Sequence, residues 1–213
     1  MTQGPNVPRG TKPSKSQGEA LGTGFSKLSQ YADILAQDGV LLGLIGPREA
    51  EIIWDRHILN CAALSELITD GQSIVDIGSG AGLPGIVLAI LKPQSKVTLI
   101  EPMQRRTDFL FKVKKDLNLE NVEIIRGRAE GQKVQAQIVT SRAVAPLNKL
   151  LAWSLPLVEK GGKVLAIKGE KAAEELEIAK KELVSLKSCT ASIKTCGKPL
   201  DLSVTVVEIS KEQ

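Results

Sequence analysis

The sequence predicts an α/β fold, a mostly parallel seven-stranded sheet with helices on both faces. From residue 73 onward, short apolar runs alternate with helical segments, as expected of parallel strands joined by crossover helices. The first of these runs ends in a cluster of glycines. The last two β-prone runs, about 188–195 and 202–209, are joined by a connection too short for a parallel crossover, so they should form an antiparallel hairpin.

The N-terminal part of the chain differs from this core. Residues 1–20 have no hydrophobic periodicity, and we expect them to be a disordered tail. Apolar residues at helical spacing predict a helix over 25–44 and a second helix that ends at Asp70-Gly71. We therefore expect one domain over 21–213, with a helical extension at 21–70 and the sheet core at 71–213.

The core elements follow from the same patterns. The predicted strands before the hairpin are 73–78, 97–101, 122–126, 137–140 and 163–168. The predicted helices between them are 86–91, 105–117, 147–158 and 172–186, the third of which should end at Gly161-Gly162.

The composition is that of an ordinary globular protein, with 42% apolar and 24% charged residues. Because the sequence contains no apolar run of about 18 residues and no secretory signal, we expect a cytoplasmic protein without a membrane span. One histidine and three cysteines without a CxxC pair predict no metal site. The helical segments show no pattern typical of a dimer interface, so we expect a monomer.

The strongest motif is the glycine loop, residues 76–85, with the sequence DIGSGAGLPG. It lies between a predicted strand and a predicted helix, where a glycine-rich turn lets the backbone approach a cofactor closely. Gly80, Gly82 and Gly85 fit a dinucleotide fingerprint, whereas Gly78, Gly80 and Gly82 fit a loop that binds S-adenosylmethionine.

Two acidic residues bear on that choice. Asp76 would repel a pyrophosphate but attract the cationic amino-acid end of S-adenosylmethionine, directly or through water. Glu101, which ends the second strand, would bind ribose hydroxyls with either cofactor. Together with the terminal hairpin, Asp76 favours S-adenosylmethionine.

Positive charge follows the strand ends, where doubly wound sheets bind their ligands. The net charge of +4 permits a polyanionic partner without requiring one. Cations on the rim that holds the cofactor would suit RNA phosphates. The cations that follow the second to fifth strands are Arg105, Arg106, Arg126, Arg128, Arg142 and Lys168, of which we expect Arg105, Arg106, Arg128 and Lys168 to bind RNA.

The sequence lacks the signatures of several methyl acceptors. Thr140-Ser141-Arg142-Ala143 stands where exocyclic-amine enzymes usually have an Asn/Asp-Pro-Pro-aromatic motif. Neither a suitably placed cysteine for pyrimidine C5 nor the residue set for ribose methylation is present. Guanine N7 has a free lone pair and needs no general base, only alignment with the methyl group. The sequence is therefore consistent with N7 chemistry.

Four segments together resemble the small-subunit ribosomal RNA methyltransferase G family, also called glucose-inhibited division protein B. The resemblance covers about residues 24–213, and its most specific parts are the Gly-Leu-Pro-Gly end of the loop and a Ser-Arg-Ala segment. The four segments are RHILN at 56–60, VDIGSGAGLPG at 75–85, SRAVAPL at 141–147 and Lys168-Gly169.

The resemblance implies a class I S-adenosylmethionine-dependent methyltransferase that methylates N7 of one guanine in 16S ribosomal RNA, as naked RNA or within the small subunit. It also implies that Glu130 lies near the adenine, Glu101 near the ribose, and that Arg142 bridges the cofactor and substrate sites as the catalytic residue. His57 looks like a packing or capping residue of the family. The residues that the resemblance places at the cofactor are Gly78, Leu83, Ala129, Glu130 and Arg142.

Three other functions stay open at this point. A Rossmann-type fold with this loop fits a nicotinamide-dependent oxidoreductase, and the basic rim fits an RNA-binding protein without catalysis. A methyltransferase for small molecules is a further alternative, which the basic rim disfavours.

Overall fold

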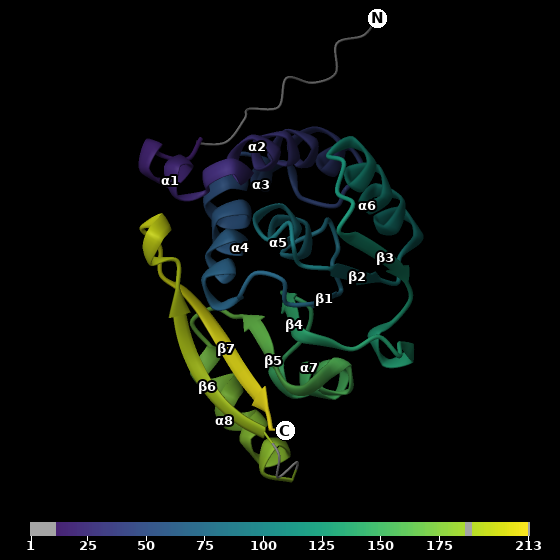
Figure 1. The fold of residues 1–213 in the computed structure, drawn as a ribbon, viewed down its shortest axis with the longest axis vertical. Helices are drawn as coiled ribbons and strands as arrows, with labels where there is room; N and C mark the ends of the chain where they lie inside the picture. The colour runs from purple at the N-terminus through teal and green to yellow at the C-terminus, as the bar shows by residue number, and fades with distance from the viewer. Residues whose placement is uncertain (1–11, 186–188, 213) are drawn as a thin grey trace, which may run out of the picture.

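A computed structural model describes residues 12–185 and 189–212, apart from the side chains of 181–185. Its centre is one seven-stranded sheet in the order β3-β2-β1-β4-β5-β7-β6 (Figure 1). The strands are β1 Ile74–Ile77, β2 Val97–Glu101, β3 Val122–Arg126, β4 Ala136–Arg142, β5 Val158–Ile167, β6 Cys189–Cys196 and β7 Val204–Lys211.

The strand directions confirm the predicted sheet. Strands β1, β2, β3, β4 and β5 pair in parallel, whereas β7 lies antiparallel between β5 and β6. The chain order reverses between β1 and β4, so the carboxyl ends of these two strands flank the point where such sheets bind ligands.

The helices are short on the N-terminal side and longer around the sheet. The α-helices are α1 Lys15–Ala20, α2 Phe25–Ile34, α3 Pro47–Ala50, α4 Leu59–Ala63, α5 Gly85–Leu91, α6 Gln104–Asp116, α7 Leu147–Ser154 and α8 Ala172–Ser185. Two π-helical turns adjoin these helices: η2 Leu35–Gly39 continues α2, and η3 Ile53–Ile58 leads into α4. The 3₁₀ turns are η1 Gly22–Gly24, η4 Leu64–Leu67, η5 Ala129–Gly131, η6 Leu155–Leu157 and η7 Lys198–Leu200. None of the helices in the described ranges is long and apolar enough to cross a membrane.

Two apolar cores lie between the sheet and the helices, one on each face of the sheet. One core packs α2, α4, α5 and α6 against one face of the sheet, and the other packs α7 and α8 against the opposite face (Figure 1). The first core joins residues as distant as Leu28 and Val206, so the N-terminal helices are part of the main hydrophobic core. This packing brings the N-terminal helices next to the glycine loop.

Two local predictions were wrong. The predicted tail of residues 1–20 includes helix α1, which begins at a capping box formed by Ser14 and Gln17; residues 1–11 lie outside the described part. The predicted helix 147–158 ends at Ser154, because Pro156 cannot continue a helix. Strand β5 then begins at Val158 and runs through both Gly161 and Gly162, which sit beside an irregularity in the pairing with β4.

Candidate active site

The glycine loop is anchored to the end of β2. The backbone N–H groups of Gly78 and Ser79 both donate to the carbonyl of Ile100, at 2.8 and 3.2 Å. Gly78 has φ +64°, and a Cβ atom there would lie 2.9 Å from Cγ2 of Val144. A side chain at this position would therefore be strained and would collide with the segment after β4. The glycine lets these two segments touch.

Glu101 joins the loop to the start of α6. Its carboxylate is 1% exposed, and Oε2 accepts a 2.9 Å hydrogen bond from the N–H of Gly80. Oε1 accepts another, also at 2.9 Å, from the N–H of Met103, and Nη1 of Arg106 lies 3.6 Å from Oε2. Because a carboxylate offers about four lone-pair sites, Glu101 retains acceptor capacity for hydroxyl donors of a ligand.

Asp76 lies beneath the loop, fully buried. Its Oδ2 accepts a 3.0 Å hydrogen bond from the N–H of Gly85, the first residue of α5, while Oδ1 has no partner among the described residues. Burial raises the pKa of Asp76 to about 7. One oxygen of this carboxylate thus holds the start of α5. The expected contact of Asp76 with the cofactor's amino-acid end stays a prediction.

The first cavity of the site, which we call the cofactor cavity, has a volume of about 220 Å³ beside the glycine loop. It is lined by residues at or just after the ends of β1, β2, β3 and β4, together with one tryptophan from α7. These are Ile77, Gly78, Ile100, Pro102, Gly127, Arg128, Ala129, Glu130, Val144 and Trp153. The apolar walls, a backbone turn at η5 and one acidic side chain suit a flat heterocycle with exocyclic donors.

The second cavity, which we call the substrate cavity, has a volume of about 490 Å³. Such a volume falls in the range of roughly 300–1,000 Å³ that is usual for small-ligand sites. Val144 lines both cavities and is the one lining residue that they share. The substrate cavity is lined by Arg56, Asn60, Arg142, Ala143, Val144, Ala145, Pro146, Ile167, Lys168, Gly169 and Glu175.

The backbone between the two cavities is strained. Ala143 has φ +55°, a left-handed conformation that alanine rarely adopts. It stands between Arg142, the last residue of β4, and Val144, which packs against Gly78. Strained residues of this kind concentrate at functional sites.

Arg142 links the sheet to the N-terminal helices. Its Nη1 donates a 3.3 Å hydrogen bond to the carbonyl of Arg56, in the π-helical turn η3. The next residue of that turn, His57, is buried with Nε2 2.7 Å from Oε2 of Glu49, at ion-pair distance but without hydrogen-bond geometry. Burial, and then the charge of Arg142, lower the pKa of His57. A neutral His57 fits the packing role expected from the sequence.

The remaining predicted residues are divided between the cavities, the core and the surface. Gly78, Ala129 and Glu130 line the cofactor cavity, and Arg142 lines the substrate cavity. Leu83 is 5% exposed and belongs to the apolar core. Gly80 and Gly82 line neither cavity.

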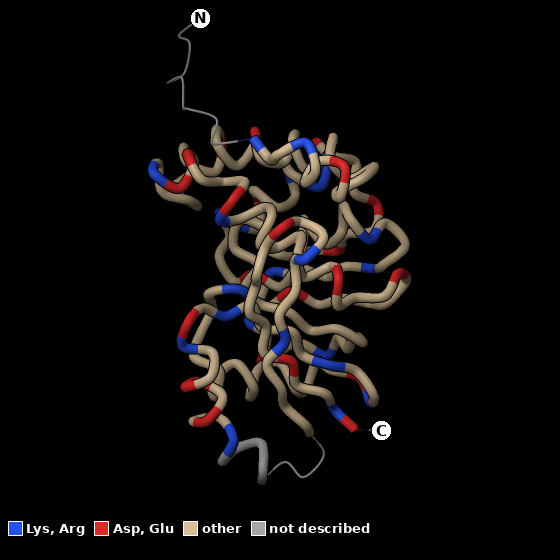
Figure 2. The backbone as a smooth tube through the Cα atoms, turned by 90° about the vertical axis from the view of Figure 1, so that its left-hand side faces the viewer, with Lys and Arg blue, Asp and Glu red and all other residues tan. Residues whose placement is uncertain are grey.

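The predicted RNA-binding cations have different surroundings. Arg105 and Arg128 are exposed, and Arg106 is half-buried beside Glu101. Lys168 differs from the free phosphate-binding cation that was expected, because its Nζ lies 2.8 Å from Oε2 of Glu175 and its side chain is only 11% exposed. Over the described backbone as a whole, charges of both signs are interspersed (Figure 2).

The sequence did not identify Arg56, Asn60 or Trp153 as site residues, although the first two stand in the RHILN segment that it singled out. Burial raises the pKa of the Cys61 thiol to about 12, so this cysteine next to the same segment remains protonated and cannot act as a nucleophile. Among the described residues no cluster could hold a metal ion.

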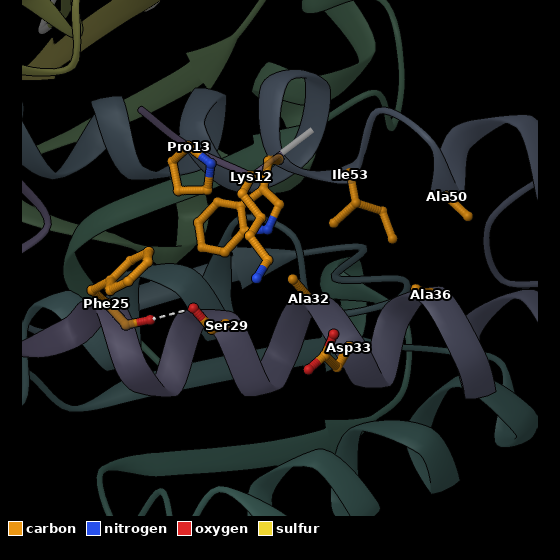
Figure 3. Close-up of a pocket in the computed structure, with 10 residues that line it drawn as sticks. Lys12, Pro13, Phe25, Ser29, Ala32, Asp33, Ala36, Ala50 and Ile53 are labelled. Atoms are coloured by element: carbon orange, nitrogen blue, oxygen red, sulfur yellow. Dashed lines mark hydrogen bonds between the residues drawn. The ribbon is translucent and has the colours of Figure 1, made fainter. Parts of the chain in front are cut away.

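A third cavity, of about 210 Å³, lies away from these residues between α2 and η3 (Figure 3). Lys12 and Pro13 form one wall and Phe25, Ala32 and Ile53 contribute apolar surface. It shares no lining residue with the cofactor or substrate cavity.

The sheet order, the glycine loop and the acidic end of β2 define a methyltransferase of the class I, Rossmann-like type. A putative S-adenosyl-L-methionine-dependent methyltransferase from Methanococcus maripaludis has the same fold, with a TM-score of 0.60, 16% identity, and coverage of 95% of this chain and 97% of that chain. The family model for rRNA small subunit methyltransferase G matches residues 25–204, and the chain belongs to this family.

Curated relatives agree with this assignment. The ribosomal RNA small subunit methyltransferase G of Thermobifida fusca is 50% identical over 201 residues, which cover 93% of this chain and 85% of the relative. The protein of the same name from Corynebacterium glutamicum strain R is 48% identical, with 92% and 90% covered.

Proposed function

We propose that this protein transfers the methyl group of S-adenosylmethionine to N7 of one guanine in 16S ribosomal RNA. The observation that carries the proposal is that the two cavities share Val144 as a lining residue. One cavity adjoins a glycine loop and an acidic strand end, and the other is large enough for a base and contains Arg142.

The chain's own groups fit this cofactor. Glu101 faces the loop with spare acceptor capacity for ribose hydroxyls, and Ala129 and Glu130 line the cofactor cavity where an adenine would lie. Oδ1 of Asp76, which is buried and has no hydrogen-bond partner in the described part of the chain, is an acceptor behind the loop. Asp76, Gly80, Gly82 and Leu83 would then shape the loop from behind, and Gly78 would contact the ligand.

When bound, S-adenosylmethionine supplies a sulfonium methyl group, which the N7 lone pair of guanine takes as the carbon–sulfur bond breaks and the sulfur keeps its electron pair. Since no proton leaves N7, the site needs no general base. The protein has to align the base with the methyl group and exclude water. We assign this alignment to Arg142, which lines the substrate cavity, and to Val144, which lines both cavities.

The target guanine has to reach the cavity from a loop or by leaving a stack, since A-form helices hide N7 in a deep groove. We assign RNA phosphate contacts to Arg105, Arg106 and Arg128 on the rim. The substrate is 16S RNA or the small ribosomal subunit, so the protein would act in the cytoplasm. We expect it to act as a monomer.

Mapping N7-methylguanine in 16S RNA with and without the protein tests the proposal. We expect one guanine to gain a methyl group from labelled cofactor. If no RNA gains a methyl group, the alternative of an RNA-binding protein without catalysis would be supported. Binding of NADH in place of S-adenosylhomocysteine in a titration would support the oxidoreductase.

A further inference from the structure

A lysine and a glutamate face each other in the wall of the substrate cavity. Lys168 follows β5, Glu175 lies on α8, and Nζ is 2.8 Å from Oε2. Both side chains are largely buried, at 11% and 25% exposed. Nζ also donates a 2.8 Å hydrogen bond to the carbonyl of Ala145, and Oε2 accepts another from the N–H of Leu147, again at 2.8 Å. Three contacts among neighbouring elements thus fix the position of the pair.

This pair is poorly suited to a phosphate. Glu175 neutralises Lys168 and would repel an anion entering the cavity. The pair instead offers a donor beside an acceptor. An ammonium group has three protons, of which Lys168 uses two on the acceptors just named, and Oε1 of Glu175 receives no hydrogen bond from the described residues.

The donor and the acceptor of this pair match adjacent groups on one edge of guanine. Ala145, whose carbonyl accepts from Lys168, directly follows Val144 in the chain, and Leu147, whose N–H donates to Glu175, lies two residues further on. Starting at N7, the guanine ring presents the O6 acceptor and then the N1–H and N2–H₂ donors. With N7 towards Val144, such a base pairs O6 with Lys168 and its two donors with Glu175.

We propose that Lys168 and Glu175 form the specificity site for the target base, with Lys168 donating to O6 and Glu175 accepting from N1–H and N2–H₂. This inference rests on the proposed N7 methylation. Adenine also has an N7, but its N6–H₂ donor would face the ammonium group and its N1 acceptor would face the carboxylate. The pair thus selects guanine by leaving buried polar groups unpaired when adenine enters.

The test compares RNA substrates that carry guanine or inosine at the methylated position, since inosine lacks only the N2 amino group. For the unaltered protein we expect kcat/KM to be roughly ten- to hundredfold higher with guanine, the usual effect of losing a hydrogen bond to a charged acceptor. In Glu175→Gln the carboxylate charge is lost while an oxygen remains for Leu147, and the ratio should fall to about threefold or less. Glu174→Gln, an exposed neighbour on the same helix, is the matched control and should keep the original ratio.

The ratio, rather than the absolute rate, carries the test, because a purely structural defect lowers both rates together. Equal rates on guanine and inosine with the unaltered protein would overturn the proposal even if Glu175→Gln does not fold. An unchanged ratio in a folded Glu175→Gln that still binds S-adenosylhomocysteine would also overturn it. If the unaltered protein methylates neither RNA at N7, the proposed function itself fails, which is a distinct result.

Discussion

The hydroxyl of Tyr31 donates a 2.6 Å hydrogen bond to the carbonyl of Ala81, within the glycine loop. Tyr31 lies on α2, is fully buried, and is the only tyrosine in the chain. A helix that precedes the sheet in sequence thus supports the loop that we assign to the cofactor.

Replacing Tyr31 by phenylalanine should weaken both the fold and cofactor binding. The buried Ala81 carbonyl would lose its partner, which costs about 1–3 kcal/mol of unfolding free energy. We also expect the affinity for S-adenosylhomocysteine to fall severalfold, as measured by calorimetry beside urea unfolding. Ser29→Ala removes an exposed hydroxyl from the same helix and should change neither quantity appreciably. Equal values for Tyr31→Phe and the unaltered protein would refute the supporting role.

Gly85→Ala tests the close packing of α5 on the sheet. A Cβ atom at Gly85 would lie 2.2 Å from Cδ2 of Leu99 and 2.7 Å from Oδ2 of Asp76. Overpacking of this kind costs about 1–3 kcal/mol of unfolding free energy, which denaturant titration measures. The control Gly131→Ala places its methyl group in open space and should be nearly neutral. Similar stabilities of the two variants would contradict this account of the packing.

The buried carboxyl of Asp76 should make stability depend on pH. Burial raises its pKa in the folded protein to about 7, above the unfolded value of 3.8, so folding favours the protonated form. Its stabilising contribution is therefore complete below about pH 4 and is lost as the pH rises to about 7.

Asp76→Asn stays uncharged and should not show this loss. The unfolding free energy of the variant minus that of the unaltered protein should therefore increase by on the order of 2–4 kcal/mol from about pH 4 to about pH 7. Urea titrations of both proteins at each pH measure the difference, in which the contributions of other groups cancel. A difference that does not vary with pH would show that Asp76 has the same pKa in the folded and unfolded protein.

Arg142→Ala should remove most of the methyl transfer while the fold survives. The guanidinium lines the substrate cavity, and loss of one such positioned donor typically lowers turnover about 10²- to 10³-fold. Labelled methyl transfer to 16S RNA measures the rate, and the melting temperature reports the fold. Arg48→Ala removes an equal charge from an exposed position and should retain its activity. Near-normal turnover in Arg142→Ala would remove this residue from the mechanism.

Local sequence patterns were sufficient to predict the sheet and the glycine loop. The run of apolar residues before Gly78 and the proline and glycine that start α5 each act within a few residues of chain. The end of α7 was harder to predict from the sequence, because Gly161 and Gly162 suggested a helix end but instead lie within β5. Pro156 was the more informative signal.

The substrate cavity depends on contacts that no local pattern contains. Arg56 meets Arg142 across 86 residues of sequence, through a backbone carbonyl that every residue possesses. Lys168 was expected at the rim from its place after a strand, but its charge is balanced by Glu175 on the next helix. Whether a cation is free or paired depends on how α8 packs, which becomes apparent only in three dimensions.

The left-handed backbone at Ala143 affects how rigid the site is before its ligands bind. Glycine would adopt this conformation at about 1–2 kcal/mol less cost, but it would also populate many others. The methyl group of Ala143 therefore lowers the stability of the folded protein but makes the turn between Arg142 and Val144 more rigid. A turn that is already rigid loses little conformational entropy when a base and a cofactor meet across it.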